Sequence, residues 1–424
     1  MTVFNNANVI SGGKILYGYD VWTDGDKIVR VSPPRESRER SGPRTDGAAT
    51  GPRAAAGPRA AAGAIHPSTG KNAPSAGGHT IDASGMYLSA GFIDLHVHGG
   101  MGHDFMDASR DAFEGIAAYH ASRGVTSMLA TTLACGDAET FAFLESYTRY
   151  AASVRSCRYL GVHLEGPYLN VSQCGAQDPR HIRDPYPEHY EKLLEYACVK
   201  RVSAAPELKG GYELGRYLRR RGILAAIAHS DADYDEAVSA LESGYTLVTH
   251  LYSGMRGVHR RDAYRYGGLI EAALLLDGFT AEVIADNRHL PECLLKLIYK
   301  CKGPDGVVLV SDAMRGAGLP EGGTTIIGSL NQGREVIIED GVAKMPDRTA
   351  FAGSVASGDR LVRTMTQTAG VPLAEAVGMM TVNPARQLGL SDRIGDVREG
   401  MDADIILFDA DININLAMVA GEFI

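Results

Sequence analysis

The sequence predicts an α/β fold, a (β/α)8 TIM barrel joined to a small β-sandwich domain that both ends of the chain build. Apolar runs rich in β-branched residues alternate with amphipathic segments, which is typical of parallel strands connected by helices. Eight such runs occur between residues 92 and 311, and eight is the number that a closed barrel of this kind requires. Short strand-like segments also occur at both ends of the 424-residue chain.

The N-terminal region is predicted to contain three strands followed by an insertion. The strands are expected at residues 3–10, 15–22 and 27–31, where β-branched and aromatic residues dominate and Gly-rich turns separate the runs. Residues 33–79 contain the sequence GPRAAA twice and no Phe, Tyr or Trp, so they cannot bury enough apolar area to offset their chain entropy. We therefore expect a disordered low-complexity insertion there, with ordered structure resuming at residue 80.

The eight apolar runs are predicted to be the barrel strands. They span residues 92–97, 126–131, 160–164, 201–205, 223–228, 246–251, 281–285 and 307–311. The amphipathic segments between most of them are predicted to be helices, at residues 108–123, 137–153, 188–199, 214–221, 233–243 and 291–301. A doubly wound sheet is the alternative, but it would usually carry a Gly-x-Gly-x-x-Gly turn after its first strand, and this sequence has none there.

Strand-like sequence returns after the eighth run. Strands are expected at residues 341–344, 404–408 and 418–424, and helices at residues 357–369 and 372–389. Because strands then flank the barrel on both sides in the sequence, we predict one small β-sandwich domain from residues 1–32 and 80–89 together with about 385–424. The barrel is predicted to span residues 90–384.

Composition and charge exclude several classes of protein. The formal net charge of −9 disfavours a general nucleic-acid-binding protein, which usually has a basic face. The six cysteines form no Cys-x-x-Cys pair, so we expect reduced thiols and a cytoplasmic location. The N-terminal sequence lacks the basic and apolar segments of a signal peptide, and no stretch is long enough to span a membrane. A nucleic-acid or membrane partner is therefore not expected.

The clearest functional signal is the polar residue at the end of each predicted strand. In a barrel the C-terminal ends of the strands surround the active site, so such side chains would converge at one mouth. His96 and His98 stand two residues apart on the first strand, so they point the same way and can bind one metal ion together. Other strands end in Glu165 (third), His229 (fifth), His250 (sixth), Asp286 (seventh) and Asp312 (eighth).

These residue types indicate a metal centre. A single histidine or aspartate at a strand end is more often a helix cap or a satisfied polar group, but such residues end five strands here, the first, third, fifth, sixth and eighth. Imidazole and carboxylate ligands suit Zn²⁺ or Fe²⁺, whereas Mg²⁺ and Ca²⁺ prefer oxygen. Asp312 would lie within reach of a water molecule at that centre and is a natural general base. His163, two residues before Glu165, is expected to pack inward rather than bind metal.

Longer segments around these residues match those of a known family. They are GFIDLHVHGG (91–100), GVHLEGPYLN (161–170), AHSDADYDEA (228–237), VTHLYSGM (248–255), EVIADNRHLP (282–291), LVSDAM (309–314), AGS (352–354), TVNPARQLGL (381–390) and GDVREGMDADIILFD (395–409). On these motifs the chain resembles the amidohydrolase superfamily and, within it, the N-acetylglucosamine-6-phosphate deacetylase family. HLEGP followed by AHS, THL and SDAM is far more specific than a His-x-His pair alone.

The resemblance implies roles for the residues at the mouth. One or two divalent ions, Zn or Fe, are expected per subunit. Their ligands would be Glu165, His229 and His250 for the main ion, with His96 and His98 holding a second ion or helping to bind the first. Asp312 would be the catalytic acid and base, and His289 would contact the bound sugar or its carbonyl.

Several expected substrate-binding positions differ from the usual family sequence. Gln177 stands where the family usually has histidine, and Ser253-Gly254 stand where it usually has Asn-Ala. The motif around the family's phosphate-binding arginine is not preserved in this sequence. Counting back from the segment at residues 268–274 places that arginine at Arg265. The alternatives are Arg260 and Arg261, which belong to the same basic cluster as Arg256 and His259. We expect Gln177, Ser253, Gly254, Arg265, Arg261 and His259 to contact the substrate together with His289.

The predicted activity is removal of the N-acetyl group from an amino sugar, which releases acetate and the free amine. The expected substrate is N-acetylglucosamine 6-phosphate or a related N-acyl hexosamine. The resemblance also implies a homodimer in which the partner lends a phosphate-binding residue, with residues 252–266 at the contact.

Four other functions compete with this prediction. Another deacylase or a deaminase of the same superfamily would use a similar centre. A cyclic amidase commonly bridges two metals with a carbamylated lysine at the end of strand four, but the sequence there, from Ala204 to Glu207, has no lysine. A non-catalytic scaffold barrel would have no reason to keep Glu165, His229, His250 and Asp312.

Overall fold

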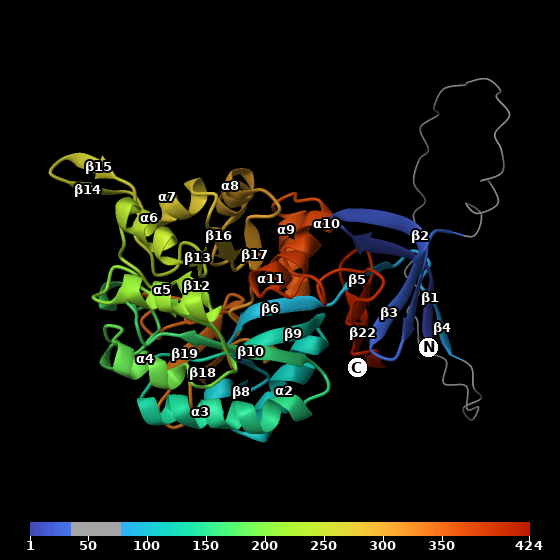
Figure 1. Ribbon diagram of the computed structural model, residues 1–424, viewed down its shortest axis with the longest axis horizontal. Coiled ribbons are helices and arrows are strands. Elements are labelled where there is room, and N and C mark those ends of the chain that lie inside the picture. The colour runs from blue at the N-terminus through green and yellow to red at the C-terminus, as the bar shows by residue number, and fades with distance from the viewer. Residues whose placement is uncertain (35–77) are drawn as a thin grey trace, which may run out of the picture.

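A computed structural model describes residues 1–34 and 78–424, so nearly all of the insertion predicted at residues 33–79 lies outside the described residues. Figure 1 shows two bodies side by side, a larger barrel with helices and a smaller β-sheet body that contains both chain ends. This arrangement confirms the predicted fold class. The division of the chain near residues 90 and 385 stays a prediction.

Eight parallel strands form the barrel, and all lie where the sequence predicts them. They are β6 (Phe92–Val97), β9 (Val125–Thr131), β10 (Arg158–Glu165), β11 (Val199–Ala204), β12 (Leu224–Ile227), β13 (Tyr245–Val248), β16 (Thr280–Val283) and β17 (Val307–Leu309). Neighbours in the order β17-β16-β13-β12-β11-β10-β9-β6 are hydrogen-bonded. A bridge between Val97 and Ala313 joins the end of β6 to the loop after β17 at the C-terminal rim. The strands appear as continuous apolar runs because both of their faces are buried.

Helices cover the outside of the barrel and pack on the terminal sheet. They are α2 (Arg110–Ala121), α3 (Asp137–Tyr150), α4 (Pro187–Leu193), α5 (Gly211–Arg221), α6 (Tyr234–Ser243), α7 (Leu269–Leu275), α8 (Glu292–Lys302), α9 (Gly358–Gln367), α10 (Leu373–Gly378) and α11 (Val382–Gln387). Local signals set their ends: α6 begins with a capping box between Asp233 and Glu236 and stops at Gly244, whose φ is 112°. In the described part of the chain, no helix is both long and apolar enough to cross a membrane.

Two predicted helices differ from the structure. The helix expected at residues 188–199 ends at Leu193, because turns follow it and Val199 already begins β11. The helix expected at residues 372–389 is two helices, α10 and α11. Pro384 has no backbone N–H to donate, so it fits in the first turn of α11 but could not continue α10.

Both ends of the chain pair in one eight-stranded sheet. Its strands are β1 (Thr2–Ser11), β2 (Lys14–Asp24), β3 (Lys27–Ser32), β4 (His79–Asp82), β5 (Tyr87–Ala90), β21 (Ile405–Phe408), β22 (Ile414–Val419) and β23 (Glu422–Phe423). They enclose a separate core that includes Phe4, Val21, Leu88, Ile405 and Met418. The strand expected at residues 418–424 has wrong bounds, because Ala420 and Gly421 form a turn with φ values of 52° and 79° between β22 and β23.

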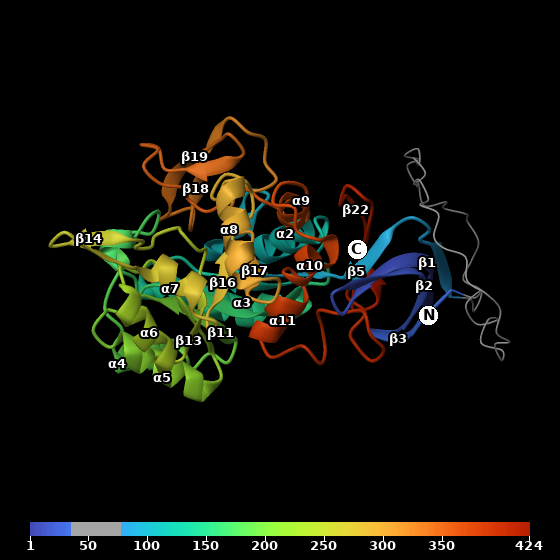
Figure 2. The same ribbon diagram turned by 90° about the horizontal axis from the view of Figure 1, so that it is seen from above.

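Antiparallel elements at the barrel mouth are largely missing from the sequence prediction, which expects only the strand at residues 341–344. β18 (Gly323–Ile327), β19 (Arg334–Glu339) and β20 (Val342–Lys344) form a sheet inserted after the eighth barrel strand, and Figure 2 shows β18 and β19 standing clear of the barrel. β14 (His259–Arg261) and β15 (Tyr264–Tyr266) form a hairpin that projects at the left of Figure 1. A third pair, β7 (Gly99–Gly100) and β8 (His103–Asp104), follows β6.

Candidate active site

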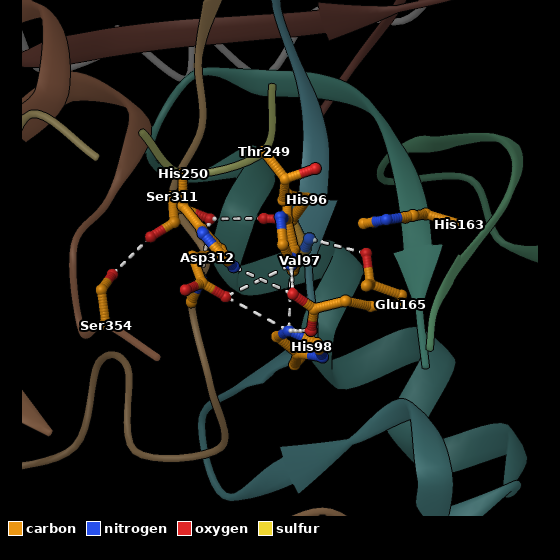
Figure 3. Close-up of polar contacts among 12 residues, drawn as sticks. His96, Val97, His98, His163, Glu165, Thr249, His250, Ser311, Asp312 and Ser354 are labelled. Carbon is orange, nitrogen blue, oxygen red and sulfur yellow. Dashed lines mark hydrogen bonds and ion pairs between the residues drawn. The ribbon is translucent and has the colours of Figure 1, made fainter. Parts of the chain in front are cut away.

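Glu165, the last residue of β10, lies at the centre of a cluster of buried histidines at the barrel rim. Its Oε1 atom is 3.0 Å from Nε2 of His250 and 3.3 Å from Nε2 of His229. The same oxygen is 3.6 Å from Nε2 of His96, and Oε2 is 3.4 Å from Nε2 of His98. Figure 3 shows the labelled His96, His98 and His250 side chains gathered around this carboxylate. The structure therefore brings together all five sequence-predicted metal ligands.

Three residues of the cluster have unusual backbone conformations. His229, His250 and Asp312 follow their strands with φ values of 45°, 30° and 49°. Positive φ is uncommon for residues other than glycine and costs about 1–3 kcal/mol each, and such residues are concentrated at functional sites. The strained backbone turns these side chains toward the barrel mouth instead of continuing each strand.

The arrangement of donors fits a bound cation. Nδ1 of His96 lies 2.9 Å from Oε1 of Glu282, and Nδ1 of His229 donates to the carbonyl oxygen of Gln173 at 2.8 Å. With the proton on Nδ1, the Nε2 lone pair of each histidine faces the Glu165 carboxylate. A lone pair and a carboxylate cannot hydrogen-bond to each other, so a cation between them is needed. Two sets have ligand atoms within 4.8 Å of one another: His96, His98 and Glu165, and Glu165, His229 and His250.

Electrostatics at the cluster favour positive charge. Burial opposes protonation of His96, but Asp312, Glu165 and Glu282 outweigh it and raise the pKa of His96 to about 10. Burial likewise opposes protonation of His98, while hydrogen bonds to Asp312 and Glu165 raise its pKa to about 9. The carboxylates thus create a site that attracts a cation, and imidazole with carboxylate suits zinc or iron.

Asp312 lies beside the histidines on the loop after β17. Its Oδ1 atom is 3.2 Å from Nε2 of His98 and 3.4 Å from Nε2 of His96. Burial raises the pKa of Asp312, but the charge of His96 and the hydrogen bond from His98 lower it overall. The carboxylate is therefore ionised and able to accept a proton.

A cavity of about 340 Å³ opens onto the cluster. Its walls include Glu165, His98, His229, His250, Asp312, Gln177, Tyr252, Ser253, Gly254, His289, Thr349 and Phe351. His289 lies 4.6 Å from the Phe351 ring, and its Nδ1 atom is 2.9 Å from Oδ2 of Asp286. Asp286 itself does not line the cavity, and its carboxylate accepts hydrogen bonds from the backbone N–H and Nδ1 of His289, which does.

Gln177 lies in the cavity wall, but its side-chain amide is engaged within the protein. Nε2 donates to Oε2 of Glu165 at 2.7 Å, and Oε1 accepts the backbone N–H of Ala134 at 2.8 Å. Arg334 of β19 donates to the carbonyl oxygens of Ala176 and Gln177 at 3.1 and 3.2 Å. The inserted sheet therefore holds the loop that orients Glu165.

Gly254 packs directly against His229. Its φ is +59°, and a Cβ atom at this position would lie 2.8 Å from Nδ1 of His229 and 2.9 Å from the carbonyl oxygen of Gln173. Those two atoms form the hydrogen bond that orients the His229 ring. Glycine at residue 254 therefore leaves this bond undisturbed.

The arginines predicted to bind phosphate lie away from the cavity of their own chain. Arg261 and Arg265 are exposed on the β14–β15 hairpin, and the Arg261 guanidinium lies 4.2 Å from the Tyr266 ring centre. The His259 ring stacks on the Tyr266 ring in the same hairpin, with the ring centres 5.7 Å apart. Among the described residues that line the cavity there is no arginine or lysine.

Sequence reasoning missed the residues behind the histidines. Glu282 of β16 and Arg201 of β11 are fully buried and paired beneath the cluster. A signal for both was available, because a charged residue inside an otherwise apolar strand has to find a partner in the barrel interior. His163 packs inward as predicted and places Nε2 2.7 Å from Oγ of Ser203.

Comparison with known proteins gives consistent matches. The chain matches the model of the amidohydrolase family over residues 87–424. It is 33% identical over 348 residues to the N-acetylglucosamine-6-phosphate deacetylase of Lysinibacillus sphaericus, covering 80% of this chain and 86% of that protein. The structure of N-acetylglucosamine-6-phosphate deacetylase from Pasteurella multocida is similar with a TM-score of 0.83 and 26% identity, covering 100% of this chain and 99% of that one. A mutant N-acetyl-D-glucosamine-6-phosphate deacetylase from Mycobacterium smegmatis, in complex with N-acetyl-D-glucosamine-6-phosphate, also has a TM-score of 0.83 and 26% identity, covering 100% and 98%.

Proposed function

This chain belongs to the amidohydrolase family, within the group of N-acetylglucosamine-6-phosphate deacetylases, and from this we propose that it hydrolyses the acetamide of an N-acetylated amino sugar phosphate. The products are acetate and the free amino sugar phosphate. The observation that carries the proposal is the convergence of Glu165, His229 and His250 beside Asp312 at the floor of the cavity. N-Acetylglucosamine 6-phosphate is the first substrate to test, because the relatives carry its name.

Glu165, His229 and His250 are the proposed ligands of one divalent ion, zinc or iron. His96 and His98 either hold a second ion or complete the first site. Bound there, the ion supplies a Lewis acid that polarises the amide carbonyl and makes a water molecule more acidic. The hydrogen bonds from Gln177 to Glu165 and from His229 to Gln173 hold the ligands in place.

Asp312 is the proposed acid and base. Its carboxylate takes a proton from the attacking water and then gives that proton to the nitrogen of the sugar, which must be protonated to leave. Asp286 accepts a hydrogen bond from Nδ1 of His289, which leaves Nε2 of His289 available to the substrate. Phe351 and Tyr252 offer apolar surface to the sugar ring on the cavity wall.

The phosphate is proposed to be bound by the partner of a homodimer. Because the described residues that line the cavity include no arginine or lysine, a dianionic group there has no strong counter-charge from its own subunit. The β14–β15 hairpin carries Arg260, Arg261 and Arg265 on an exposed arm, with Tyr264 72% exposed.

We place the enzyme in the cytoplasm, in keeping with its six free cysteines.

The proposal is tested by assaying acetate release from a panel of N-acetyl hexosamines, with and without a 6-phosphate, after reconstitution with zinc or iron. We expect turnover of the phosphorylated sugars to depend on the added metal and to exceed that of the unphosphorylated ones. A protein that binds metal but releases acetate from none of the panel would contradict the proposed substrate class.

A further inference from the structure

A fully buried ion pair lies beneath the metal cluster. Arg201 comes from β11 and Glu282 from β16, and both side chains are 0% exposed. Nη1 of Arg201 lies 2.5 Å from Oε2 of Glu282. A buried ion pair adds little stability compared with apolar residues of the same volume, because both charges lose their hydration. Stability alone therefore does not explain why the barrel interior contains this pair.

Glu282 contacts two of the proposed metal ligands. Its Oε1 atom lies 2.9 Å from Nδ1 of His96 and accepts the backbone N–H of His250 at 3.2 Å. One carboxylate oxygen thus joins the side chain of the ligand on β6 to the main chain of the ligand after β13. The other oxygen is left for Arg201.

Arg201 contacts the residues that precede the same two ligands. Nη1 donates to the carbonyl oxygen of Leu95 at 3.0 Å, and Nη2 donates to Oγ1 of Thr249 at 2.9 Å. Nη2 also donates to Oγ of Ser203 at 3.4 Å, so four partners fix the planar guanidinium, which holds Glu282 in a single position. Among the residues lining the cavity, neither Arg201 nor Glu282 is present.

We propose that Glu282, fixed by Arg201, is a positioning residue that sets His96 and His250 for metal binding. Because Glu282 accepts the hydrogen bond from Nδ1–H of His96, the Nε2 lone pair of His96 is directed at Glu165, His98 and Asp312. The inference rests on the proposed metal-dependent function. It adds that the affinity of the site depends on an ion pair that touches neither the ion nor the substrate.

The test compares the Zn²⁺ affinity of the whole protein and its variants by competition with a chromophoric chelator. Glu282→Gln keeps the shape of the side chain but removes the charge and sets an amide against Arg201. We expect Zn²⁺ affinity to fall about 10- to 100-fold. In steady-state assays kcat should fall at limiting metal while KM changes less than about twofold, because Glu282 does not line the cavity.

Two further variants keep the test informative. Asp404→Asn weakens a different largely buried pair, in which Oδ2 of Asp404 lies 2.9 Å from Nε of Arg158 beside the terminal sheet, and Zn²⁺ affinity should stay at the wild-type value. If Glu282→Gln does not fold, the double variant Arg201→Met with Glu282→Leu replaces the pair by apolar side chains, an exchange that is often neutral or stabilising for a buried ion pair. The double variant should fold and still bind Zn²⁺ at least about tenfold more weakly.

The outcomes separate the two proposals. A wild-type protein that binds no Zn²⁺ or iron would overturn the proposed function and this inference with it. A wild type that binds the ion, with folded Glu282 variants that match its affinity, would overturn the inference alone. Equal losses in Asp404→Asn and Glu282→Gln would also overturn it, because the effect would then be a general loss of stability.

Discussion

The backbone N–H of Asp312 donates to the carbonyl oxygen of His96 at 2.9 Å. This bond joins the loop after the last barrel strand to the first strand, one residue before the bridge between Val97 and Ala313. Closure of the barrel therefore brings the proposed base to the proposed ligand. Figure 3 shows Asp312 beside His96, and the Ser354 hydroxyl donates to the carbonyl oxygen of Ser311 in the same loop.

Replacing Asp312 by asparagine should separate catalysis from metal binding. Asparagine fills the same space and keeps the backbone bond to His96, but it cannot accept a proton from water. We expect kcat to fall about 10²- to 10⁴-fold while the metal content per subunit stays at the wild-type level. Activity within about threefold of wild type in a metal-loaded Asp312→Asn protein would rule out this residue as the base.

Gln177→Leu should weaken metal binding through Glu165. The substitution removes the 2.7 Å bond from Gln177 to Oε2 of Glu165, so the carboxylate is free to rotate away from the histidines. We expect Zn²⁺ affinity to fall about tenfold, measured with a competing chelator. Gln387→Leu is the matched control. It removes a similar bond, from Gln387 to Oγ1 of Thr280 at 2.8 Å, at the N-terminal end of β16, away from the barrel mouth. An equal effect of the two substitutions would contradict a role for Gln177 at the centre.

Gly254→Ala should displace the His229 ring. The new methyl group would lie 2.8 Å from Nδ1 of His229, closer than van der Waals contact allows, and the backbone φ of +59° is unfavourable for alanine. We expect weaker Zn²⁺ binding together with a loss of about 1 kcal/mol or more in the free energy of unfolding. Gly378→Ala, where no atom lies within 4 Å, should leave Zn²⁺ binding unchanged. Retention of full metal affinity in Gly254→Ala would show that the His229 ring does not need this packing.

The sequence is sufficient to predict the eight barrel strands, because burial on both faces leaves an apolar run that needs no tertiary information. It also predicts the cluster of Glu165, His229, His250 and Asp312, because all parallel strands deliver their last residues to the same rim. In the inserted sheet, β18 and β19 were not predictable in this way. Both strands are partly exposed, and their buried residues pack with Met314 in an apolar cluster separate from the barrel core.

Partners of individual side chains were also beyond sequence reasoning. Gln177 occupies a position where substrate contact was expected, and only the loop geometry shows that its amide meets Glu165 and Ala134. The same applies to Asp286, whose position at a strand end resembles that of a ligand. The turn after β16 directs its carboxylate to the backbone N–H groups of Arg288 and His289 instead.

Buried His120 should make the protein less stable in acid. Burial lowers its pKa from 6.5 to about 4, and its Nε2 atom lies 3.0 Å from the carbonyl oxygen of Gly99. Between pH 6.5 and about 4 the unfolded chain binds a proton that native His120 does not, so stability is lost as pH falls through this window. This amounts to about 2 kcal/mol between pH 7 and 5. Urea unfolding of the metal-free proteins should show that loss to be smaller in His120→Gln, and an identical pH dependence would contradict the assignment.

Mixing two impaired variants should reveal whether the β14–β15 arm serves the partner subunit. Arg265→Ala should raise KM for the phosphorylated sugar at least about tenfold and leave the unphosphorylated one unaffected, because only the phosphate loses a charge-assisted bond. Arg216→Ala on α5 should do neither. In a symmetric dimer with an exchanged arm, Arg265→Ala subunits mixed equally with Asp312→Asn subunits form hybrids with one intact site, so about a quarter of wild-type activity should return at low substrate concentration. If the arm serves its own subunit, every hybrid site lacks either Arg265 or Asp312, and the mixture would show no more activity than the two variants assayed separately.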